Sequence, residues 1–391
     1  MASTFVTLFL AGTAAAVTLV QRNLSTRCKE VSFQVSGTAQ NVVITNPNDI
    51  QGTIDSLTAN LLTATVSGTQ TLAGYYCEPY INNANSTKLQ IFRGSFFTNR
   101  ESWTALGGTP LFSPPLAPYQ PQIYSWFEFV NKLGYPTLAI DSLGDGNSSR
   151  PDPVTVAQIP YEVAIYHDLV QKIRAGTTGQ LPCKYSYIAH IGNSLGSVLG
   201  TNTAAAYPQD FDAIVLTGYS KAVYPSFPGV SLNAPAPASV VNATRFPKYP
   251  LGYVTSTNQT SLTNSFFGQQ GIVDFDPQVA ALFYQRRDTV SLGNVVATYL
   301  PTSAPVATGF KGRVLVITGE NDQAFCGLGS SALSPNTMCG PLLKETGTLY
   351  PAADYNYQSV PKTGHATILH KNAKFVFTVA HNFLAGAHYG A

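Results

Sequence analysis

The sequence predicts an α/β fold: a mostly parallel central sheet with helices on both faces and an inserted lid or cap. Short, continuous apolar segments alternate along the chain with helical patterns, which is typical of a parallel sheet covered on both faces. Several of these apolar segments run directly into glycine-rich turns. In such folds, catalytic side chains are expected at the carboxyl ends of the strands.

The expected strands follow from alternating or continuous apolar residues bounded by turn residues. Residues 30–44 alternate like a strand pair. A helix is expected at 153–173 despite Pro160, because apolar residues recur there with helical spacing. Further strands are expected at 72–80, 87–93, 135–141, 184–194, 211–219, 313–322 and 355–365, and further helices at 195–207 and 366–386.

One long segment breaks this alternation and is rich in Pro, Asn, Ser, Thr and aromatic residues. We expect residues 21–217 and 310–391 to form the α/β core. Residues 218–309 are expected to form an inserted lid over the strand ends, with a helix near 276–288. A long disordered loop is the alternative, because loops beyond about 15 residues in compact domains are either functional or mobile.

Composition argues against two classes of protein. Apolar residues make up 44% of the 391 residues and charged residues 11%, so disorder driven by high charge is excluded. The formal net charge of +2 comes without a basic stripe, which argues against a nucleic-acid partner. The 21 Tyr and 21 Phe residues favour an aromatic-lined interior or pocket.

Residues 1–20 contain an apolar run that ends in small residues, as in a secretory signal peptide, although no positive charge precedes it. Its cleavage site stays open, and a short buried helix or a membrane anchor is the alternative. No later segment reaches the roughly 18 apolar residues of a transmembrane helix. We therefore expect a secreted, extracellular protein without stable membrane insertion. Sequons that permit glycosylation begin at Asn23, Asn85, Asn147, Asn242 and Asn258.

The five cysteines lack the spacing of a zinc site. We pair Cys28 with Cys77 and Cys326 with Cys339, because each pair flanks a loop-rich segment, and expect Cys183 to be a free thiol. Closing the shorter loop would stabilise the fold by about 3 kcal/mol and brace the segment just upstream of Cys326. Other connectivities stay open.

Residues 192–196, Gly-Asn-Ser-Leu-Gly, match the pattern G-x-S-x-G between an expected strand and an expected helix. The glycines allow a tight turn, so that Ser194 Oγ stands at the amino end of the helix, where amide dipoles stabilise negative charge. This context favours a nucleophile over one more serine in a glycine-rich turn.

A nucleophilic serine needs a base that removes its proton and an acid that orients the base. Asp322 and His365 each follow an expected strand, in the chain order Ser, Asp, His that this architecture uses. We therefore predict Ser194, Asp322 and His365 as the catalytic triad, with Glu320 as the alternative acid. Structural or surface positions are expected for four other histidines, namely His167 and His190 and, within the closing helix, His370 and His381.

Acyl transfer also needs two backbone N–H groups that stabilise the oxyanion of the tetrahedral intermediate. One is expected from Leu195, directly after the nucleophile, and the other from Ser95 or Phe96, in the loop that follows the strand at 87–93. Arg93 stands beside this loop, and it either fixes the loop through hydrogen bonds or is solvated.

With these motifs in place, residues 85–390 resemble the α/β-hydrolase superfamily of the AB-hydrolase-1 type and, within it, secreted fungal serine hydrolases. The similarity rests on FRGSFF, where the family usually has His-Gly, and on DSLGDGNSS, GNSLG, GEND and GHATILH. The resemblance implies Ser194, Asp322 and His365 as the triad, a lid between the sixth and seventh core strands, and a structural turn at Asp141. A serine at the elbow differs from the aspartate of related epoxide hydrolases and haloalkane dehalogenases.

The sequence therefore predicts a secreted serine hydrolase that cleaves a carboxylic ester or lactone of an apolar small molecule. No dinucleotide motif, P-loop or metal-ligand cluster occurs in it, so neither cofactor nor metal is expected. A C–C lyase, acyltransferase or cyclase with the same triad is the alternative, and a non-catalytic binding relative is the third candidate. Aromatic lid residues are expected to shape the pocket, for example Phe227, Phe266, Phe267 and Phe283.

Overall fold

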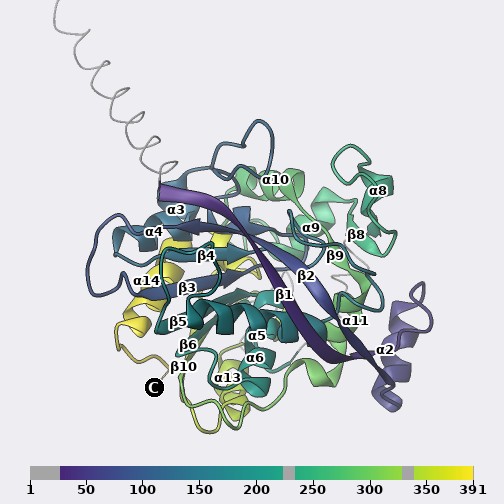
Figure 1. Cartoon of the computed structure of the whole chain (residues 1–391). Helices are drawn as coiled ribbons and strands as arrows, with labels where there is room; N and C mark the ends of the chain where they lie inside the picture. The colour runs from purple at the N-terminus through teal and green to yellow at the C-terminus, as the bar shows by residue number, and fades with distance from the viewer. Residues whose placement is uncertain (1–26, 223–233, 328–338, 391) are drawn as a thin grey trace, which may run out of the picture.

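The computed structural model describes residues 27–222, 234–327 and 339–390, and it shows a central sheet covered by helices on both faces (Figure 1). The expected leader, Asn23 and Phe227 lie outside these ranges. The sheet has eight strands in the order β1-β2-β4-β3-β5-β6-β10-β11. Strand β2 is antiparallel to both of its neighbours, and the strands from β4 to β11 are parallel. The predicted α/β fold is confirmed. The strands are β1 (Cys28–Val42), β2 (Thr63–Cys77), β3 (Lys88–Arg93), β4 (Thr137–Ile140), β5 (Tyr187–Asn193), β6 (Ala213–Thr217), β10 (Arg313–Gly319) and β11 (Asp354–Val360).

Helices α5 and α6 pack on one face of the sheet, and α4 and α14 pack on the other (Figure 1). Within the described residues, no helix is long and apolar enough to cross a membrane. The helices of the core are α2 (Ile50–Ala59), α3 (Pro121–Tyr124), α4 (Trp126–Lys132), α5 (Ile159–Ala175), α6 (Leu195–Ala206), α12 (Gln323–Cys326), α13 (Cys339–Thr346) and α14 (Ala373–Leu384), with short 3₁₀ turns at Arg100–Trp103, Gly347–Leu349 and Thr367–Leu369.

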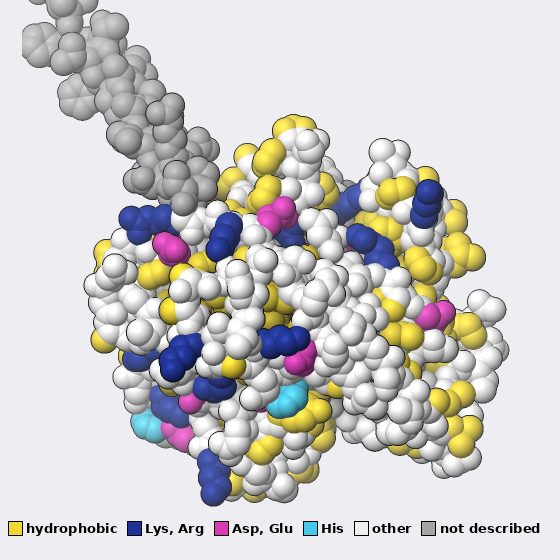
Figure 2. All heavy atoms as spheres, viewed as in Figure 1, with side chains coloured by type: hydrophobic (Ala, Val, Ile, Leu, Met, Phe, Trp, Pro, Cys, Tyr) yellow, Lys and Arg dark blue, Asp and Glu magenta, His cyan; other side chains and the backbone are white. Residues whose placement is uncertain are grey.

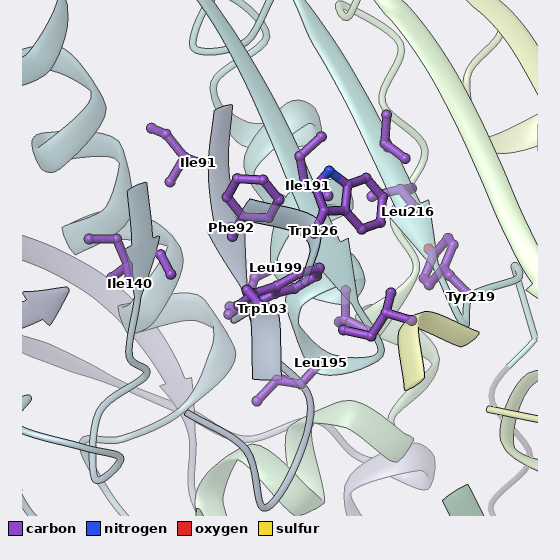
Figure 3. Close-up of a cluster of buried hydrophobic side chains, with 14 of the residues drawn as sticks. Ile91, Phe92, Trp103, Trp126, Ile140, Ile191, Leu195, Leu199, Leu216 and Tyr219 are labelled. Carbon is purple, nitrogen blue, oxygen red and sulfur yellow. The ribbon is translucent and has the colours of Figure 1, made fainter. Parts of the chain in front are cut away.

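An aromatic cluster anchors strand β3 in the core (Figure 3). The Trp126 ring of α4 lies 5.9 Å from the Phe92 ring of β3 and 4.7 Å from the Phe377 ring of α14, measured between ring centroids. The Trp103 ring lies 5.0 Å from the Phe92 ring. Burying one large apolar side chain stabilises a fold by about 1.5–3 kcal/mol. This packing holds the end of β3, where the predicted oxyanion loop begins.

The stretch predicted as a strand pair at 30–44 is a single strand, so this prediction was wrong. Strand β1 pairs antiparallel with β2 over its full length, with Cys28 opposite Cys77, and a disulfide joins these two residues. The strand continues through Gly37 without turning. A Cβ at Gly37 would lie 2.9 Å from the Ala164 Cβ, so the glycine serves a close approach between β1 and α5.

Two helices differ from their predicted bounds. Helix α5 begins later than predicted, because the Asp152 side chain first closes a turn on the N–H groups two and three residues further on. Pro160 lies in the first turn of α5, where its missing N–H costs no hydrogen bond. The predicted closing helix is divided into a 3₁₀ turn and α14, and His370 lies between them rather than within a helix.

Residues 218–309 lie in the chain between β6 and β10, the sixth and seventh strands of the sheet. The alternative of a long disordered loop is wrong for residues 234–309, which form helices and a small antiparallel sheet. The expected helix near 276–288 is α10. The sheet was not predicted, because strands of two to four residues carry no periodic signal. Its elements are β7 (Pro235–Pro237), β8 (Tyr253–Ser256) and β9 (Val290–Ser291), and the helices are α8 (Ala238–Val241), α9 (Gln259–Phe266), α10 (Pro277–Arg286) and α11 (Leu292–Tyr299), followed by a 3₁₀ turn at Pro301–Ser303.

Candidate active site

Ser194 stands between β5 and α6, where the chain turns sharply from strand into helix. Its backbone has φ 55° and ψ −115°, a conformation that a residue with a side chain adopts only under constraint. The Ser194 N–H donates to the Thr217 carbonyl oxygen of β6 at 3.0 Å, and the Val198 N–H donates to the Ser194 carbonyl oxygen at 3.0 Å. The neighbouring strand and the following helix therefore hold the turn from both sides.

The two glycines of the motif let the elbow lie close against its surroundings. A Cβ at Gly196 would lie 2.0 Å from the Arg93 carbonyl oxygen, and a Cβ at Gly192 would lie 2.5 Å from the Ser197 nitrogen. The Gly196 N–H donates to the Gly94 carbonyl oxygen at 2.8 Å. The elbow and the loop after β3 are thus joined directly.

Asp322 and His365 are in direct contact. His365 Nδ1 donates to Asp322 Oδ2 at 2.8 Å, and both side chains are buried. Asp322 Oδ1 accepts the backbone N–H groups of Ala324 and Phe325, at 2.9 and 3.1 Å. A carboxylate fixed in this way holds the imidazole with Nδ1 protonated, so that Nε2 is free to act as a base. Glu320, the alternative acid, forms no hydrogen bond or ion pair with His365 in the described parts of the chain.

Gly218, directly after β6, lies between the imidazole and the elbow. A Cβ there would be 3.1 Å from His365 Nδ1 and 3.2 Å from Asn193 Nδ2, on the residue that precedes Ser194. Among the described residues, however, no hydrogen bond joins Ser194 Oγ to His365 Nε2. Catalytic hydrogen bonds often tighten only when substrate is bound. The three predicted side chains thus lie at one edge of the sheet, with only Asp322 and His365 hydrogen-bonded.

The predicted oxyanion donors lie on the two joined segments. The backbone N–H groups of Leu195, Ser95 and Phe96 have no hydrogen-bond partner within the described ranges, so all three stay candidates for the oxyanion donors. The next residue, Phe97, is anchored to the insertion. Its N–H donates to the Thr289 carbonyl oxygen at 3.1 Å. Its carbonyl oxygen accepts a hydrogen bond from the Asp288 N–H at 2.8 Å.

Arg93 is buried, so the solvated alternative is wrong. Its Nη2 donates to Glu162 Oε2 at 2.5 Å and to Ser142 Oγ at 3.0 Å, and its guanidinium lies 5.0 Å from the Tyr166 ring centroid. Asn294 of the insertion donates to the other Glu162 oxygen at 2.7 Å. The arginine therefore ties the start of the loop after β3 to α5 and, through Glu162, to the insertion.

His190, upstream of the elbow, has a structural position. A carbonyl oxygen can only accept, so His190 Nε2–H donates to the Gly196 carbonyl oxygen at 2.9 Å, and Nδ1 accepts from the Tyr166 hydroxyl at 2.9 Å. Burial lowers the pKa of His190 to about 3, so the ring stays neutral and keeps both bonds near neutral pH. His167 is partly exposed and pairs with Asp210.

His370 joins the loop of His365 to the insertion. Its Nε2 accepts the Gly364 N–H at 3.2 Å, and its Nδ1 donates to the Asp274 carbonyl oxygen at 3.3 Å. The ring of Phe267 packs against it, with 5.4 Å between centroids. Because the sequence placed His370 in a helix, it offered no sign of this contact.

Aromatic rings cover His365. Phe266 of the insertion lies 5.4 Å from the imidazole centroid, and Phe325 of α12 stacks on it at 5.6 Å. Phe283 packs behind Phe266, with 5.0 Å between centroids. Ser194 and His365 are only 7% and 4% exposed. Of the described aromatic residues predicted to shape the pocket, only Phe266 has its ring in contact with His365.

The structure contains the second expected disulfide, Cys326–Cys339, and leaves Cys183 exposed and unpaired. Cys326 ends helix α12, whose first N–H groups bind Asp322. Cys339 begins α13, and its sulfur lies 3.5 Å from the Gly319 carbonyl oxygen of β10. The disulfide therefore holds this short helix, and with it Asp322, close to the end of β10.

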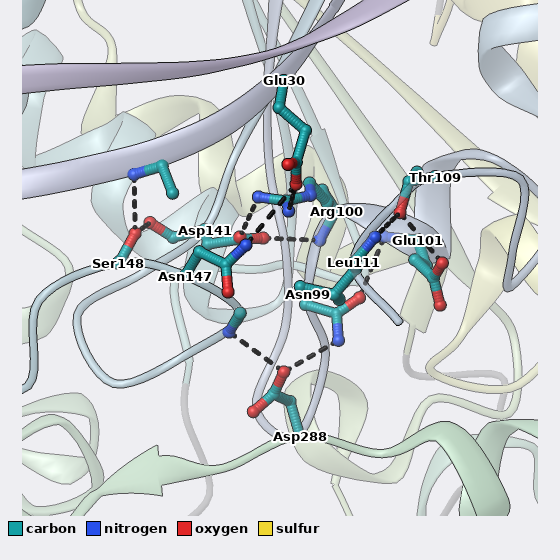
Figure 4. A network of polar contacts seen from close by, with 12 residues as sticks. Glu30, Asn99, Arg100, Glu101, Thr109, Leu111, Asp141, Asn147, Ser148 and Asp288 are labelled. Carbon is teal, nitrogen blue, oxygen red and sulfur yellow. Dashed lines mark hydrogen bonds and ion pairs between the residues drawn. The ribbon is translucent and has the colours of Figure 1, made fainter. Parts of the chain in front are cut away.

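A buried polar network lies under the turn that follows β4 (Figure 4). Asp141 accepts the Arg100 backbone N–H at 2.7 Å and its guanidinium at 2.8 Å, which agrees with a structural role. Asp288 of the insertion accepts the Asn99 side-chain amide at 2.8 Å and the Gly146 N–H at 3.1 Å. In the described part of the chain, no group of three or more His, Cys, Asp or Glu residues is placed to hold a metal ion.

No protein-family model and no curated protein sequence matches the chain. An esterase from Thermogutta terrifontis is similar in structure, with a TM-score of 0.53 and 13% identity over 82% of this chain and 95% of its own. The enol-lactonase from Burkholderia xenovorans LB400 has a TM-score of 0.51 and 14% identity, over 81% and 97%. An α/β-hydrolase fold protein from Chitinophaga pinensis has a TM-score of 0.51 and 14% identity, over 81% and 94%. The chain therefore has the α/β-hydrolase fold.

Proposed function

We propose that this chain is a serine hydrolase that cleaves a carboxylic ester or lactone of an apolar small molecule. The observation that carries the proposal is the 2.8 Å hydrogen bond between Asp322 and His365 beside the strained elbow of Ser194. The similarity in fold to an esterase and an enol-lactonase supports the reaction class.

In this reaction, Ser194 Oγ attacks the carbonyl carbon while His365 Nε2 takes the hydroxyl proton. The imidazolium keeps its Nδ1–H bonded to the Asp322 carboxylate, and the N–H groups of Leu195 and of the loop after β3 stabilise the oxyanion. The imidazolium then returns the proton to the departing alcohol, which leaves an acyl-enzyme. Water, deprotonated by the same imidazole, releases the acid and regenerates the serine.

We assign residues 218–309 as a lid over a core formed by 21–217 and 310–391. Two contacts support this division: the Phe266 ring packs on His365, and the insertion hydrogen-bonds to Phe97 in the oxyanion loop. The aromatic cover favours an apolar acyl or alkoxy group next to the scissile bond.

Turnover of an ester panel in H₂¹⁸O tests this function. Hydrolysis places one ¹⁸O atom in the released acid, and Ser194→Ala abolishes the release. The low exposure of Ser194 and His365 favours exclusion of water, so acyl transfer is the second candidate. Transfer to an added alcohol would give a new ester without ¹⁸O, and absence of both products from folded wild type would contradict a serine acyl-transfer enzyme.

We propose further that the protein is exported. The two disulfides support an oxidising compartment, and Asn147, Asn242 and Asn258 are exposed sequon residues. The mature chain should begin near residue 21 and lose mass on enzymatic deglycosylation. An intact leader on the natively produced protein would contradict export by signal cleavage.

A further inference from the structure

A groove of about 800 Å³ lies apart from the Ser194 edge, between the insertion and two loops of the core. Figure 2 shows a notch at the top of the molecule, between two lobes, with Lys or Arg side chains on its walls. None of Ser194, Asp322 and His365 lines the groove. Its walls come from Leu111–Leu116, Gly146–Arg150, Asn242–Tyr249 and Gln285–Asp288.

Three arginines of the groove lack a carboxylate partner. Arg150, Arg245 and Arg286 donate to backbone carbonyl oxygens, and none of them forms an ion pair with another described residue. By contrast, Arg93 and Arg100 are each bonded to buried carboxylates. The carbonyl groups fix the three guanidinium groups in position. The buried Glu101 carboxylate acts on Arg286 and Arg245 through space, but it forms no ion pair with either of them and does not line the groove.

Among the described residues that line the groove, Asp288 is the only acidic one, and its carboxylate is already engaged. It is only 3% exposed, and its Oδ2 accepts the Asn99 amide and the Gly146 N–H (Figure 4). The groove therefore presents three cations against one enclosed anion.

Aromatic rings lie beside two of these cations. The Arg245 guanidinium lies 4.9 Å from the Phe112 ring centroid and 5.1 Å from that of Phe246. The Arg150 guanidinium lies 4.3 Å from the Tyr249 ring centroid. Such stacking holds a guanidinium in place and leaves its edge N–H groups available for a carboxylate. The groove thus combines fixed positive charge with flat apolar surface.

We infer that this groove binds a small organic anion with a flat aromatic body, such as an aryl carboxylate. The carboxylate accepts charge-assisted hydrogen bonds from the guanidinium groups, which are stronger than bonds between neutral groups. The ring of the ligand packs on the aromatic side chains. Because the catalytic side chains are elsewhere, this binding does not depend on the proposed hydrolase activity.

Titration of the full chain with 2-naphthoate, followed by the fluorescence of the ligand, tests the inference. The measurement uses Ser194→Ala, and 2-naphthamide serves as the uncharged ligand of the same shape. We expect the amide to bind at least about tenfold more weakly, because it lacks the charge that the guanidinium groups pair with. Arg150→Gln should weaken naphthoate binding roughly fivefold. Arg150→Lys should weaken it less, because lysine keeps the charge but loses the guanidinium fork and its stacking on Tyr249.

Arg150 is exposed, so its replacement leaves the fold intact, as a thermal unfolding curve would verify. Arg174→Gln is the matched control, because Arg174 pairs with Asp212 outside the groove. This variant should bind naphthoate with the same affinity as the protein without the substitution. Equal binding of naphthoate and naphthamide, no binding at millimolar naphthoate, or undiminished binding by Arg150→Gln would overturn the inference. The last result would place the anion elsewhere, for example at the Ser194 edge as a reaction product.

Discussion

The carboxyl edge of the sheet and the insertion next to it are held in place by different kinds of interaction. Ser194, Asp322 and His365 each lie within a few residues of the end of a parallel strand, so strand register brings them to one edge. The described part of the insertion, from 234 to 309, forms a small sheet and short helices. It is held through separate contacts, such as the Phe266 ring on His365 and the hydrogen bonds to Phe97. In the proposed mechanism, the edge therefore carries the chemistry and the insertion adjusts it.

Substitutions at the edge should abolish turnover while leaving the fold intact, and substitutions in the insertion should change turnover modestly.

His365→Ala should lower kcat about 10⁵- to 10⁶-fold, because no other group would remove the Ser194 proton. The measurement is ester turnover together with circular dichroism. His167→Ala is the control, since His167 is partly exposed and pairs with Asp210 on the surface. Retention of more than a tenth of wild-type kcat by folded His365→Ala would remove His365 from the mechanism.

Asp322→Asn should lower kcat about 10⁴-fold, because an amide in place of the carboxylate no longer holds the imidazole with Nδ1 protonated. Asp276→Asn is a close control. Both aspartates cap a helix by accepting backbone N–H groups, but Asp276 begins α10 in the insertion. If the two variants lost activity equally, the loss would come from capping rather than from the contact with His365.

Asp288→Asn should lower kcat/KM about tenfold, by loosening the residues that hold the oxyanion loop. The Asp288 N–H bonds to the Phe97 carbonyl oxygen, and its carboxylate accepts the Asn99 amide. One imperfect hydrogen bond costs about 1–1.5 kcal/mol, which corresponds to this loss. Steady-state kinetics would check it, again beside Asp276→Asn. A loss of kcat/KM above a thousandfold would show that the insertion takes part directly in catalysis, which would contradict the contrast between the sheet edge and the insertion.

Glu101→Gln should alter stability rather than turnover. Burial raises the pKa of Glu101 to about 7 from its ordinary 4.5. Between pH 4.5 and 7 the folded state therefore binds more protons than the unfolded state, so the free energy of unfolding falls as pH rises through this window. Removing the carboxylate should stabilise the protein by about 1–3 kcal/mol at pH 8 and little at pH 4.5. Urea unfolding at both pH values measures this.

The control for that experiment is Glu345→Gln, since the Glu345 side chain is largely exposed in its ion pair with Lys221. It should change stability by less than about 1 kcal/mol at either pH. If the free energy of unfolding changed with pH equally in both variants, burial of Glu101 would not be the cause of the effect.

The fold class and the placement of the candidate triad could be expected from the sequence because both depend on local pattern. Continuous apolar strands and the Gly-Asn-Ser-Leu-Gly turn are short-range signals. The burial of Arg93 could not be expected, since its partner Glu162 lies 69 residues away. The single long strand β1 was also missed, because Gly37 suggests a turn when its neighbour Ala164 is unknown.

The insertion illustrates the same limit. Its helix α10 has a clear apolar period, but the contact of Phe266 with His365 depends on how α9 docks. Such docking depends on contacts between residues that are far apart in the sequence, so local sequence patterns do not predict it. Contacts of this kind decide which of several similar phenylalanines reaches the site.

The most direct test of the account is reaction with a fluorophosphonate, followed by mass mapping of the modified peptide. Wild type and Ser194→Ala would be compared after both are shown to be folded. The account predicts one phosphonyl group on wild type, on the peptide that contains Ser194, and none on the variant. Modification of a different residue, or equal labelling of the two proteins, would contradict an activated serine at this elbow.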